Sequence, residues 1–281
     1  MGAQAYRTRM AGDTGFDALL PAAMAEKAEQ AGVTKANLPL RRLVPLGVLA
    51  GAFIGLGANF SQVITADTGL SPGIRSLLGG LVFSLGLILV VISGAELFTG
   101  NTLIVMAFAS RRVTALRLLR NWGVVYVANF VGAVSVAALV HWSGKLDAGD
   151  GALGNRVLAM AETKGGLDWS NAFVSGILAN TLVCLAVWMT MSAHSLIDKV
   201  AVIVFPITAF VAAGYEHSIA NMYFFPLALF HGPTNEQQHV TWSHFLVDNL
   251  VPVTLGNIVG GAVLVGLVYW FVYLRGRPAT S

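Results

Sequence analysis

Six long apolar stretches alternate with polar segments along the chain. They cover residues 43–66, 74–109, 118–142, 171–193, 200–230 and 247–274. A helix needs about 20 apolar residues to cross the hydrocarbon core of a bilayer, and each stretch reaches that length. The pattern predicts an all-α membrane protein with six transmembrane helices in one domain over residues 43–274. An N-terminal region (1–42) and a short tail (275–281) flank this domain.

The second and fifth stretches are too long for one simple span, and polar residues interrupt both of them. The interruptions are Gly-Ala-Glu-Leu-Phe-Thr-Gly-Asn at residues 94–101 and Gly-Tyr-Glu-His-Ser at residues 214–218. Irregular backbone at membrane depth is tolerated only where protein buries it or where it lines a cavity. We therefore expect helices 2 and 5 to be broken inside the membrane.

Residues 16–33 have the pattern of an amphipathic helix that precedes the first span. Its apolar side would hold Leu19, Leu20, Ala23, Met24, Ala28 and Ala31, opposite Glu26, Lys27, Glu29 and Gln30. Such a helix lies along the membrane surface or folds against the bundle or a neighbouring subunit. The alternative is a disordered tail with weak periodicity.

The composition agrees with a membrane protein, because only 11% of the residues are charged and 56% are hydrophobic. A soluble domain carries about 25% charged residues. The net charge of +3 does not indicate nucleic-acid binding, since the basic residues cluster at helix ends. The single cysteine, Cys184, excludes a disulfide framework. Residues 1–42 lack the basic start and apolar core of a signal peptide.

The distribution of Lys and Arg predicts that both termini lie in the cytoplasm. With that orientation, 13 basic residues fall on the cytoplasmic side and four on the outer side. The outer four are Arg75, Lys145, Arg156 and Lys164. This bias is the one expected of a multi-pass protein in a bacterial inner membrane with an even number of spans.

Matching motifs divide the chain into two halves of three helices. The pairs are Asn129-Phe-Val-Gly-Ala-Val with Asn257-Ile-Val-Gly-Gly-Ala-Val, each with an asparagine eight residues earlier (Asn121, Asn249); Gly47-Val-Leu-Ala with Gly176-Ile-Leu-Ala; and Gly-x-Glu-x-x-x-x-Asn from Gly94 and from Gly214. Their offsets are 128, 129 and 120 residues. An odd number of crossings inverts the second copy, so the chain is expected to consist of two inverted repeats.

Inverted repeats of this kind place a solute path near the bilayer midplane, between the halves. Broken helices at corresponding positions mark that path, and their exposed N–H groups and partial positive charge favour an anion. The repeats therefore direct attention to the loops around Phe98-Thr99 and Glu216-His217.

Two other functional classes compete with a transport path. An intramembrane enzyme would need a catalytic motif, but there is no HExxH, no G-x-S-x-G and no pair of intramembrane aspartates. A metal-handling protein could use His231, His239 and His244 in one outer loop. Their irregular spacing, without acidic or cysteine partners, favours a solvated loop.

Three motifs resemble the signatures of the formate/nitrite transporter family. They are Val-Ile-Ser-Gly-Ala-Glu-Leu-Phe-Thr-Gly at 91–100, Gly-Ile-Leu-Ala-Asn-Thr-Leu-Val-Cys-Leu-Ala at 176–186 and Gly-Tyr-Glu-His-Ser-Ile-Ala-Asn-Met at 214–222. The resemblance extends from Phe16 to Arg275. One departure is Thr181, where the family has an apolar residue, so the surroundings of Asn180 should be slightly more polar.

The resemblance implies an aquaporin-like fold and a homopentamer in which each subunit has its own pore. Small residues such as Gly132, Ala133, Gly260, Gly261 and Gly266 would permit the close helix packing. It also implies that the substrate is a small monovalent anion of a weak acid, with no cofactor. Formate ranks first and nitrite second, while hydrosulfide, acetate and lactate remain open.

The resemblance further assigns roles to individual residues. His217, Thr99, Asn180, Lys164 and Glu216 would line the substrate and proton pathway. Phe83, Val183 and Phe210 would form an outer apolar constriction, and Leu87, Leu97 and Phe98 a cytoplasmic slit. Asn221 and Asn257 would support the loops. No metal ligand is expected.

A histidine at the constriction offers a physical route for a weak acid. An anion loses hydration between apolar rings at a cost of several kcal/mol, whereas the neutral acid loses far less. Histidine can change its charge near neutral pH, so His217 or a nearby water would supply the proton. The alternative is a neutral core histidine that serves packing alone. Glu96 and Glu216 are expected to bond backbone N–H groups at the broken helix ends.

Overall fold

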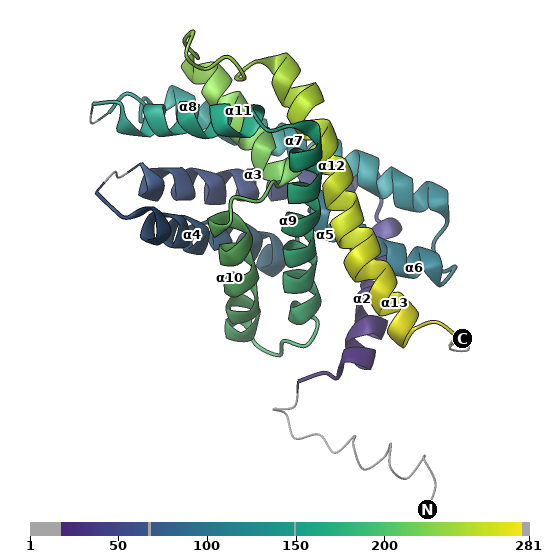
Figure 1. Cartoon of the computed structure of the whole chain (residues 1–281). Helices are drawn as coiled ribbons and strands as arrows, with labels where there is room; N and C mark the ends of the chain where they lie inside the picture. Colours follow the sequence, from purple (N-terminus) through teal and green to yellow (C-terminus); the bar gives the residue numbers. More distant parts are fainter. Residues whose placement is uncertain (1–17, 67–68, 149, 277–281) are drawn as a thin grey trace, which may run out of the picture.

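The computed structural model describes residues 18–66, 69–148 and 150–276, and this part of the chain is helical throughout, with connecting turns (Figure 1). Five helices are long and apolar enough to cross a membrane. They are α3 (Leu40–Thr65), α4 (Pro72–Ser93), α7 (Ala115–Trp142), α9 (Trp169–Thr190) and the final helix His244–Tyr273. The sixth crossing is made by α10 (Leu196–Ala212) and α11 (Ser218–His231) together.

Both predicted breaks are present. Helix α4 ends at Ser93 and is followed by α5 (Phe98–Asn101), η1 (Thr102–Ile104) and α6 (Val105–Ala109). Helix α10 ends at Ala212, and α11 resumes at Ser218. The two breaks contain Gly94 and Gly214 in the left-handed conformation, with φ of 71° and 73°. Glycine adopts this conformation without a Cβ penalty, so each first half ends cleanly. The final helix comprises η2 (His244–Leu250), α12 (Val251–Ile258), η3 (Val259–Leu267) and α13 (Val268–Tyr273).

The predicted amphipathic helix is present, with shifted bounds and a shifted buried face. Helix α2 spans Pro21–Ala36, while Phe16 and Asp17 lie outside the described residues. The buried residues are Met24, Ala25, Ala28, Gly32 and Ala36. Leu20, which was placed on the apolar side, precedes the helix and is 63% exposed. Helix α2 packs against η1 and α6, so it folds onto the bundle.

A second short helix, α8 (Ala152–Gly165), was not predicted and lies at the opposite end of the molecule from α2 (Figure 1). Its buried residues match those of α2 at the offset of 129 that also relates Gly47 to Gly176. The pairs are Ala25 and Gly154, Ala28 and Val157, Gly32 and Ala161, and Ala36 and Gly165. Each repeat therefore begins with a short helix at its own end of the molecule.

The two repeats share the same helix crossings. Helix α3 packs on α7, and α9 packs on α12. A Cβ on Gly132 would overlap the carbonyl of Val48, and one on Gly260 would overlap that of Ile177. These glycines, which the sequence suggested for subunit packing, thus serve contacts within the subunit. Tyr126 and Thr254, related by the offset of 128, are hydrogen-bonded to each other at 2.8 Å, which places the pseudo-two-fold axis between α7 and α12.

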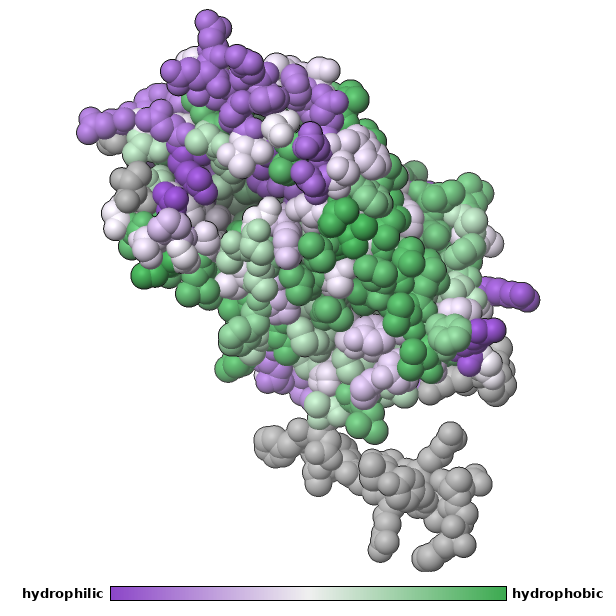
Figure 2. Space-filling view, in the orientation of Figure 1, coloured by the Kyte–Doolittle hydropathy of each residue, from purple (hydrophilic) through white to green (hydrophobic). Residues whose placement is uncertain are grey.

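The surface has the division expected of a membrane-spanning protein. Hydrophobic residues form a band across the face seen in Figure 2, between a hydrophilic cap at the α8 end and a smaller hydrophilic edge at the other end. Helices α2 and α13 contact each other, so both ends of the described chain lie on the same side. This is the arrangement required by six crossings.

Candidate functional site

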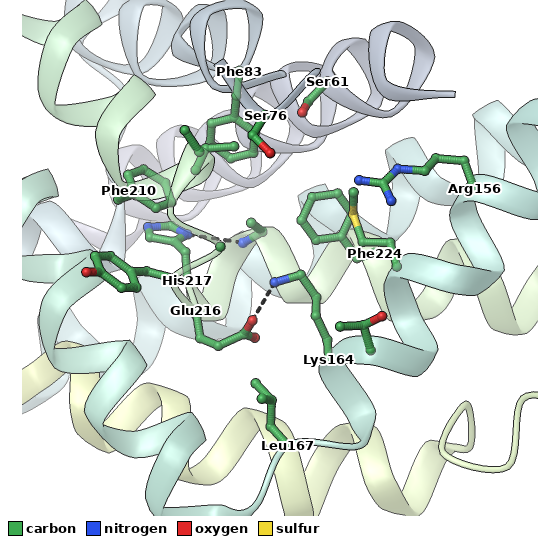
Figure 3. A pocket seen from close by; sticks show the side chains of 17 residues that line it. Ser61, Ser76, Phe83, Arg156, Lys164, Leu167, Phe210, Glu216, His217 and Phe224 are labelled. Atoms are coloured by element: carbon green, nitrogen blue, oxygen red, sulfur yellow. Dashed lines mark hydrogen bonds and ion pairs between the residues drawn. The ribbon is translucent and has the colours of Figure 1, made fainter. Parts of the chain in front are cut away.

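Two cavities lie on opposite sides of the broken helices. The cavity at the α8 end, called the outer cavity below, has a volume of about 260 Å³, and its wall includes Lys164, Glu216 and His217 (Figure 3). The cavity at the α2 end, called the inner cavity, has a volume of about 200 Å³, and its wall includes Lys35 and Leu97. The loops that interrupt the two helices therefore separate two spaces that approach from opposite ends of the molecule.

The two breaks meet in a contact between His217 and Thr99. The His217 Nε2 and Thr99 Oγ1 atoms are 3.0 Å apart, and both side chains are buried. His217 is also the N-cap of α11, because its Nδ1 accepts a hydrogen bond from the Ala220 N–H at 3.2 Å. A ring nitrogen that accepts from an N–H carries no proton of its own. This geometry assigns the proton of the ring to Nε2, which donates it to Thr99.

Asn180 connects these loops to α9. Its side-chain amide donates to the Asn257 carbonyl at 2.6 Å and to the Thr99 carbonyl at 3.2 Å. The neighbouring Thr181, the departure from the family pattern, donates its hydroxyl to the Ile177 carbonyl at 2.8 Å. That hydrogen bond lies within α9, so Thr181 leaves the bonding of Asn180 unchanged.

Phe83 and Phe210 form an apolar pair at the base of the outer cavity. Their ring centroids are 5.7 Å apart in an edge-to-face arrangement, and both side chains are buried. The ring of Phe210 also lies 5.8 Å from that of His217 (Figure 3). Val183 is buried in the same hydrophobic core but does not line either cavity. Phe83, Phe210 and His217 therefore lie together in the wall of the outer cavity.

Two of the three residues expected in the cytoplasmic slit line the inner cavity. Leu87 and Leu97 belong to its wall, and Phe98 does not. The ring of Phe98 packs edge-on against Tyr126 and Trp122 of α7, at centroid distances of 4.9 and 6.2 Å. Its backbone N–H donates to Asn129 Oδ1 at the start of α5, which holds this residue against α7.

The same network of lysine, glutamate and asparagines supports each break. Lys35 contacts Glu96 Oε1 at 2.7 Å, and Lys164 contacts Glu216 Oε1 at 2.6 Å. The second carboxylate oxygen accepts at 2.7 Å from Asn101 or from Asn221. Asn121 and Asn249 accept from these asparagines and donate to the carbonyls of Lys35 and Lys164 at 3.0 Å. The sequence predicted that these carboxylates bond backbone N–H groups. In the structure they bind side chains instead.

Asn129 and Asn257 hold the backbone of the two breaks. Asn257 Oδ1 accepts from the Ser218 N–H at 2.9 Å, and its amide donates to the carbonyls of Gly176 and Glu216 at 2.8 and 3.1 Å. Asn129 makes the corresponding three hydrogen bonds to Phe98, Gly47 and Glu96 at 2.9, 2.7 and 2.9 Å. Each asparagine satisfies the first N–H of the second half-helix and the carbonyl two residues before it, and it also bonds a carbonyl of a neighbouring helix, α9 or α3.

The sequence interpretation missed Lys35, which was counted only as a cytoplasmic charge. The signal was available, because Lys35 and Lys164 are 129 residues apart, the same offset as Gly47 and Gly176. Each repeat consequently presents one lysine to the cavity on its side.

Two of the outer-loop histidines, His239 and His244, have ring centroids 5.4 Å apart, and each of the three has a polar partner of its own. His239 pairs with Glu162 at 2.6 Å, His231 lies 3.9 Å from Asp147, and His244 bonds Thr241 at 2.8 Å. Within residues 18–66, 69–148 and 150–276, no group of three or more His, Cys, Asp or Glu side chains has the arrangement of a metal site.

Comparisons with known proteins agree with this architecture. The model of the formate/nitrite transporter family matches residues 22–271. The formate channel FocA of Escherichia coli strain K12 is 46% identical over 280 residues, covering 95% of this chain and 98% of FocA. A solved pentameric formate channel with formate bound has a TM-score of 0.78 at 41% identity, covering 84% of this chain and 98% of that one. A solved FNT family ion channel has a TM-score of 0.80 at 32% identity, covering 89% and 98%.

The family match covers both repeats, both breaks and the His217–Thr99 contact. Its description is that of a transporter, not an enzyme. The chain, a multi-pass membrane protein, belongs to the formate/nitrite transporter family.

Proposed function

We propose that this protein is a homopentameric channel that passes formate across a bacterial inner membrane, through a pore within each subunit. The observation that carries the proposal is the buried His217–Thr99 contact, which separates two cavities that each hold a lysine. The solved relative named a pentameric formate channel supports the substrate and the assembly. The relative named FocA supports the same substrate.

Selectivity in this proposal arises from the sequence of surroundings that an anion meets. Lys164 and Lys35 attract it into either cavity, because opposite charges in a partly enclosed space interact more strongly than in bulk water. The Phe83–Phe210 pair then requires the anion to give up its water. Dehydration of an anion costs several kcal/mol, whereas a neutral acid loses much less. Passage is therefore fastest for an anion that can take up a proton at this point.

His217 is placed to link passage to a proton. Its Nε2–H points toward Thr99, and Phe210 lies on the side of the outer cavity. The ring can give a proton to formate only as imidazolium, so a proton must first reach it from one of the cavities, and its transfer to formate then returns the ring to the neutral form. In the second version, a water in the cavity supplies the proton, because loss of hydration at the apolar constriction raises the basicity of the anion. Both versions require the same small acid and the same apolar constriction.

Nitrite is the second candidate, because it is also a planar, two-oxygen, monovalent anion of a weak acid. The family description names it beside formate. Hydrosulfide is protonated in the same way but presents one atom to the lysines. The orientation proposed here places α2 and the C-terminal end of α13 on the cytoplasmic side, since with that orientation 13 basic residues fall on that side and four on the other.

The test is uptake by proteoliposomes of formate, nitrite, hydrosulfide and lactate, compared at one protein density and at several pH values. We expect formate and nitrite to enter fastest and lactate slowest, with faster uptake when the outside is acidic. Uptake of formate no faster than through protein-free liposomes would refute the formate proposal. Vesicles that contain an unrelated membrane protein of similar size serve as the control for leakage.

A further inference from the structure

The outer cavity contains a second cation, Arg156, whose role is not explained by the site described above. Arg156 lies on α8 eight residues before Lys164, about 12 Å away along the helix axis at 1.5 Å per residue. Its guanidinium points toward the space beside Phe224 and Ser61 (Figure 3). An anion that approaches from this side would pass Arg156 before it reached Lys164.

The side chain of Arg156 is held in place but keeps donors free for a ligand. Its Nε donates to Thr65 Oγ1 at 3.1 Å, which ties α8 to α3. Among the described residues no carboxylate lies within 4.0 Å of its guanidinium, in contrast to Lys164, which contacts Glu216. Burial and the nearby charge of Arg75 lower the pKa of Arg156, the direction expected of a cation that lacks an anionic partner. The guanidinium nevertheless stays charged at neutral pH.

The repeat places a cation at the corresponding position on the other side. Lys27 of α2 corresponds to Arg156 at the same offset of 129 that relates Lys35 to Lys164. The Lys27 Nζ donates to the Met191 carbonyl, at 2.7 Å, and Met191 lines the inner cavity. Each short helix therefore carries two cations eight residues apart, but only Arg156, Lys164 and Lys35 line a cavity, while Lys27 lies beside the inner one through Met191. The outer residue is an arginine at one mouth and a lysine at the other.

We propose that Arg156 is a substrate-binding residue of the outer mouth, where it binds a planar two-oxygen anion before the anion moves to Lys164. The inference rests on the proposed function. A guanidinium offers parallel N–H donors that fit two oxygens of one carboxylate or of nitrite, which a lysine ammonium does not. Ser61 and Ser76 supply hydroxyl groups in the same wall. Because Lys27 lacks this fork, the two mouths bind the anion unequally.

The experiment measures initial formate flux against formate concentration in right-side-out and inside-out membrane vesicles. For Arg156→Gln, we expect the half-saturating concentration for entry from the α8 side to rise about tenfold, the usual effect of losing a hydrogen bond to a charged group. The maximal flux, and the half-saturating concentration for entry from the α2 side, should stay within twofold. For Arg156→Lys, which keeps the charge without the fork, we expect an intermediate rise.

Lys145→Gln is the matched control, because Lys145 is an exposed outer cation that does not line the cavity. Equal effects of Lys145→Gln and Arg156→Gln, or no change in Arg156→Gln, would overturn the inference. Thr65→Val keeps the charge but removes its anchor, so it should cause a smaller rise than Arg156→Gln and tests the site even if that variant fails to assemble. A wild-type protein that carries neither formate nor nitrite would overturn the proposed function and this inference together. If the wild type transports formate and Arg156→Gln transports it with the same half-saturating concentration, only this inference is overturned.

Discussion

At the scale of single residues, His217 performs two tasks that its repeat counterpart does not. Its Nδ1 caps α11 through the Ala220 N–H, and its Nε2 contacts Thr99. Leu97, 120 residues earlier, occupies the corresponding position before α5 and has no polar side chain. The two breaks have the same backbone support, so the proposed function assigns the proton transfer to the loop that contains His217.

Substitutions of His217 can separate its cap from its proton. Asparagine is a good N-cap, so His217→Asn should keep α11 intact and remain pentameric, whereas His217→Phe loses a cap worth about 1 kcal/mol. We expect both variants to lose the steep rise of formate import that the wild type shows as the outside turns acidic. The measurement is flux into liposomes at several outside pH values, with assembly checked in the same samples. If formate flux in both variants depended on pH as it does in the wild type, His217 would be a structural residue only.

The aromatic constriction gives a second prediction at this scale. Phe83→Ala or Phe210→Ala removes one ring of the edge-to-face pair and opens space beside His217. We expect a larger anion leak and weaker discrimination between formate and lactate, because the anion then keeps part of its water. Single-channel or bilayer conductance with both anions measures this. Phe271→Ala, an exposed ring on α13, is the control. Unchanged conductance and selectivity would show that both rings only pack.

At the scale of elements, the breaks depend on asparagines from other helices. Each break exposes a backbone N–H and a carbonyl inside the membrane, where an unpaired polar group is costly. Asn257 from α12 satisfies one set, and Asn129 from α7 satisfies the other. Helices α7 and α12 are therefore the supports that keep α5 and α11 in line with α4 and α10.

This support predicts a loss of stability when an asparagine is removed. Asn257→Ala or Asn129→Ala leaves several buried backbone groups unpaired, at a cost of about 1–3 kcal/mol for each unsatisfied group. We expect a clearly lower melting temperature of the purified assembly and reduced flux in both variants. The two variants should lose similar amounts of both, because the two sites are related by the repeat. Asn155→Ala, on the exposed face of α8, should melt like the wild type. If Asn257→Ala and Asn129→Ala both melted at the wild-type temperature, this account would be contradicted.

At the scale of the whole molecule, a single subunit leaves a broad apolar surface exposed. Residues such as Leu116, Val127, Leu139, Ile197 and Phe205 are more than half exposed, on helices that span the membrane. Lipid and neighbouring subunits together must cover this surface, because exposed apolar patches of this size are unfavourable in water.

The proposed assembly is directly measurable. We expect native mass spectrometry of the detergent-purified protein to give a mass of five subunits, with no stable monomer. Gly132 and Gly260 lie at crossings within the subunit, so Gly132→Leu should damage the fold of each subunit and not merely separate subunits. Circular dichroism of that variant distinguishes the two effects. A stable monomer or trimer of the wild-type protein would contradict the pentamer.

The sequence by itself determined the six crossings, the two breaks and the repeat, because these depend on local features: length of apolar runs, interrupting polar residues and recurring motifs. It also singled out His217 and Thr99, through a motif that resembles a known family. It did not predict α8, whose mean hydropathy is low and whose helical pattern is short. It also placed Leu20 on a buried face that begins only at Met24.

Only the tertiary structure decided what each polar residue contacts. The pairing of Lys35 with Glu96, the position of Phe98 against α7 and the hydrogen bond from Arg156 to Thr65 all depend on residues far apart in the chain. A hydropathy pattern records which side chains avoid water, not which partners they meet once the helices have packed. For that reason the sequence predicted Lys164 as a pathway residue, whereas the structure placed Lys35 in the equivalent position beside Glu96 and brought Arg156 into the outer cavity.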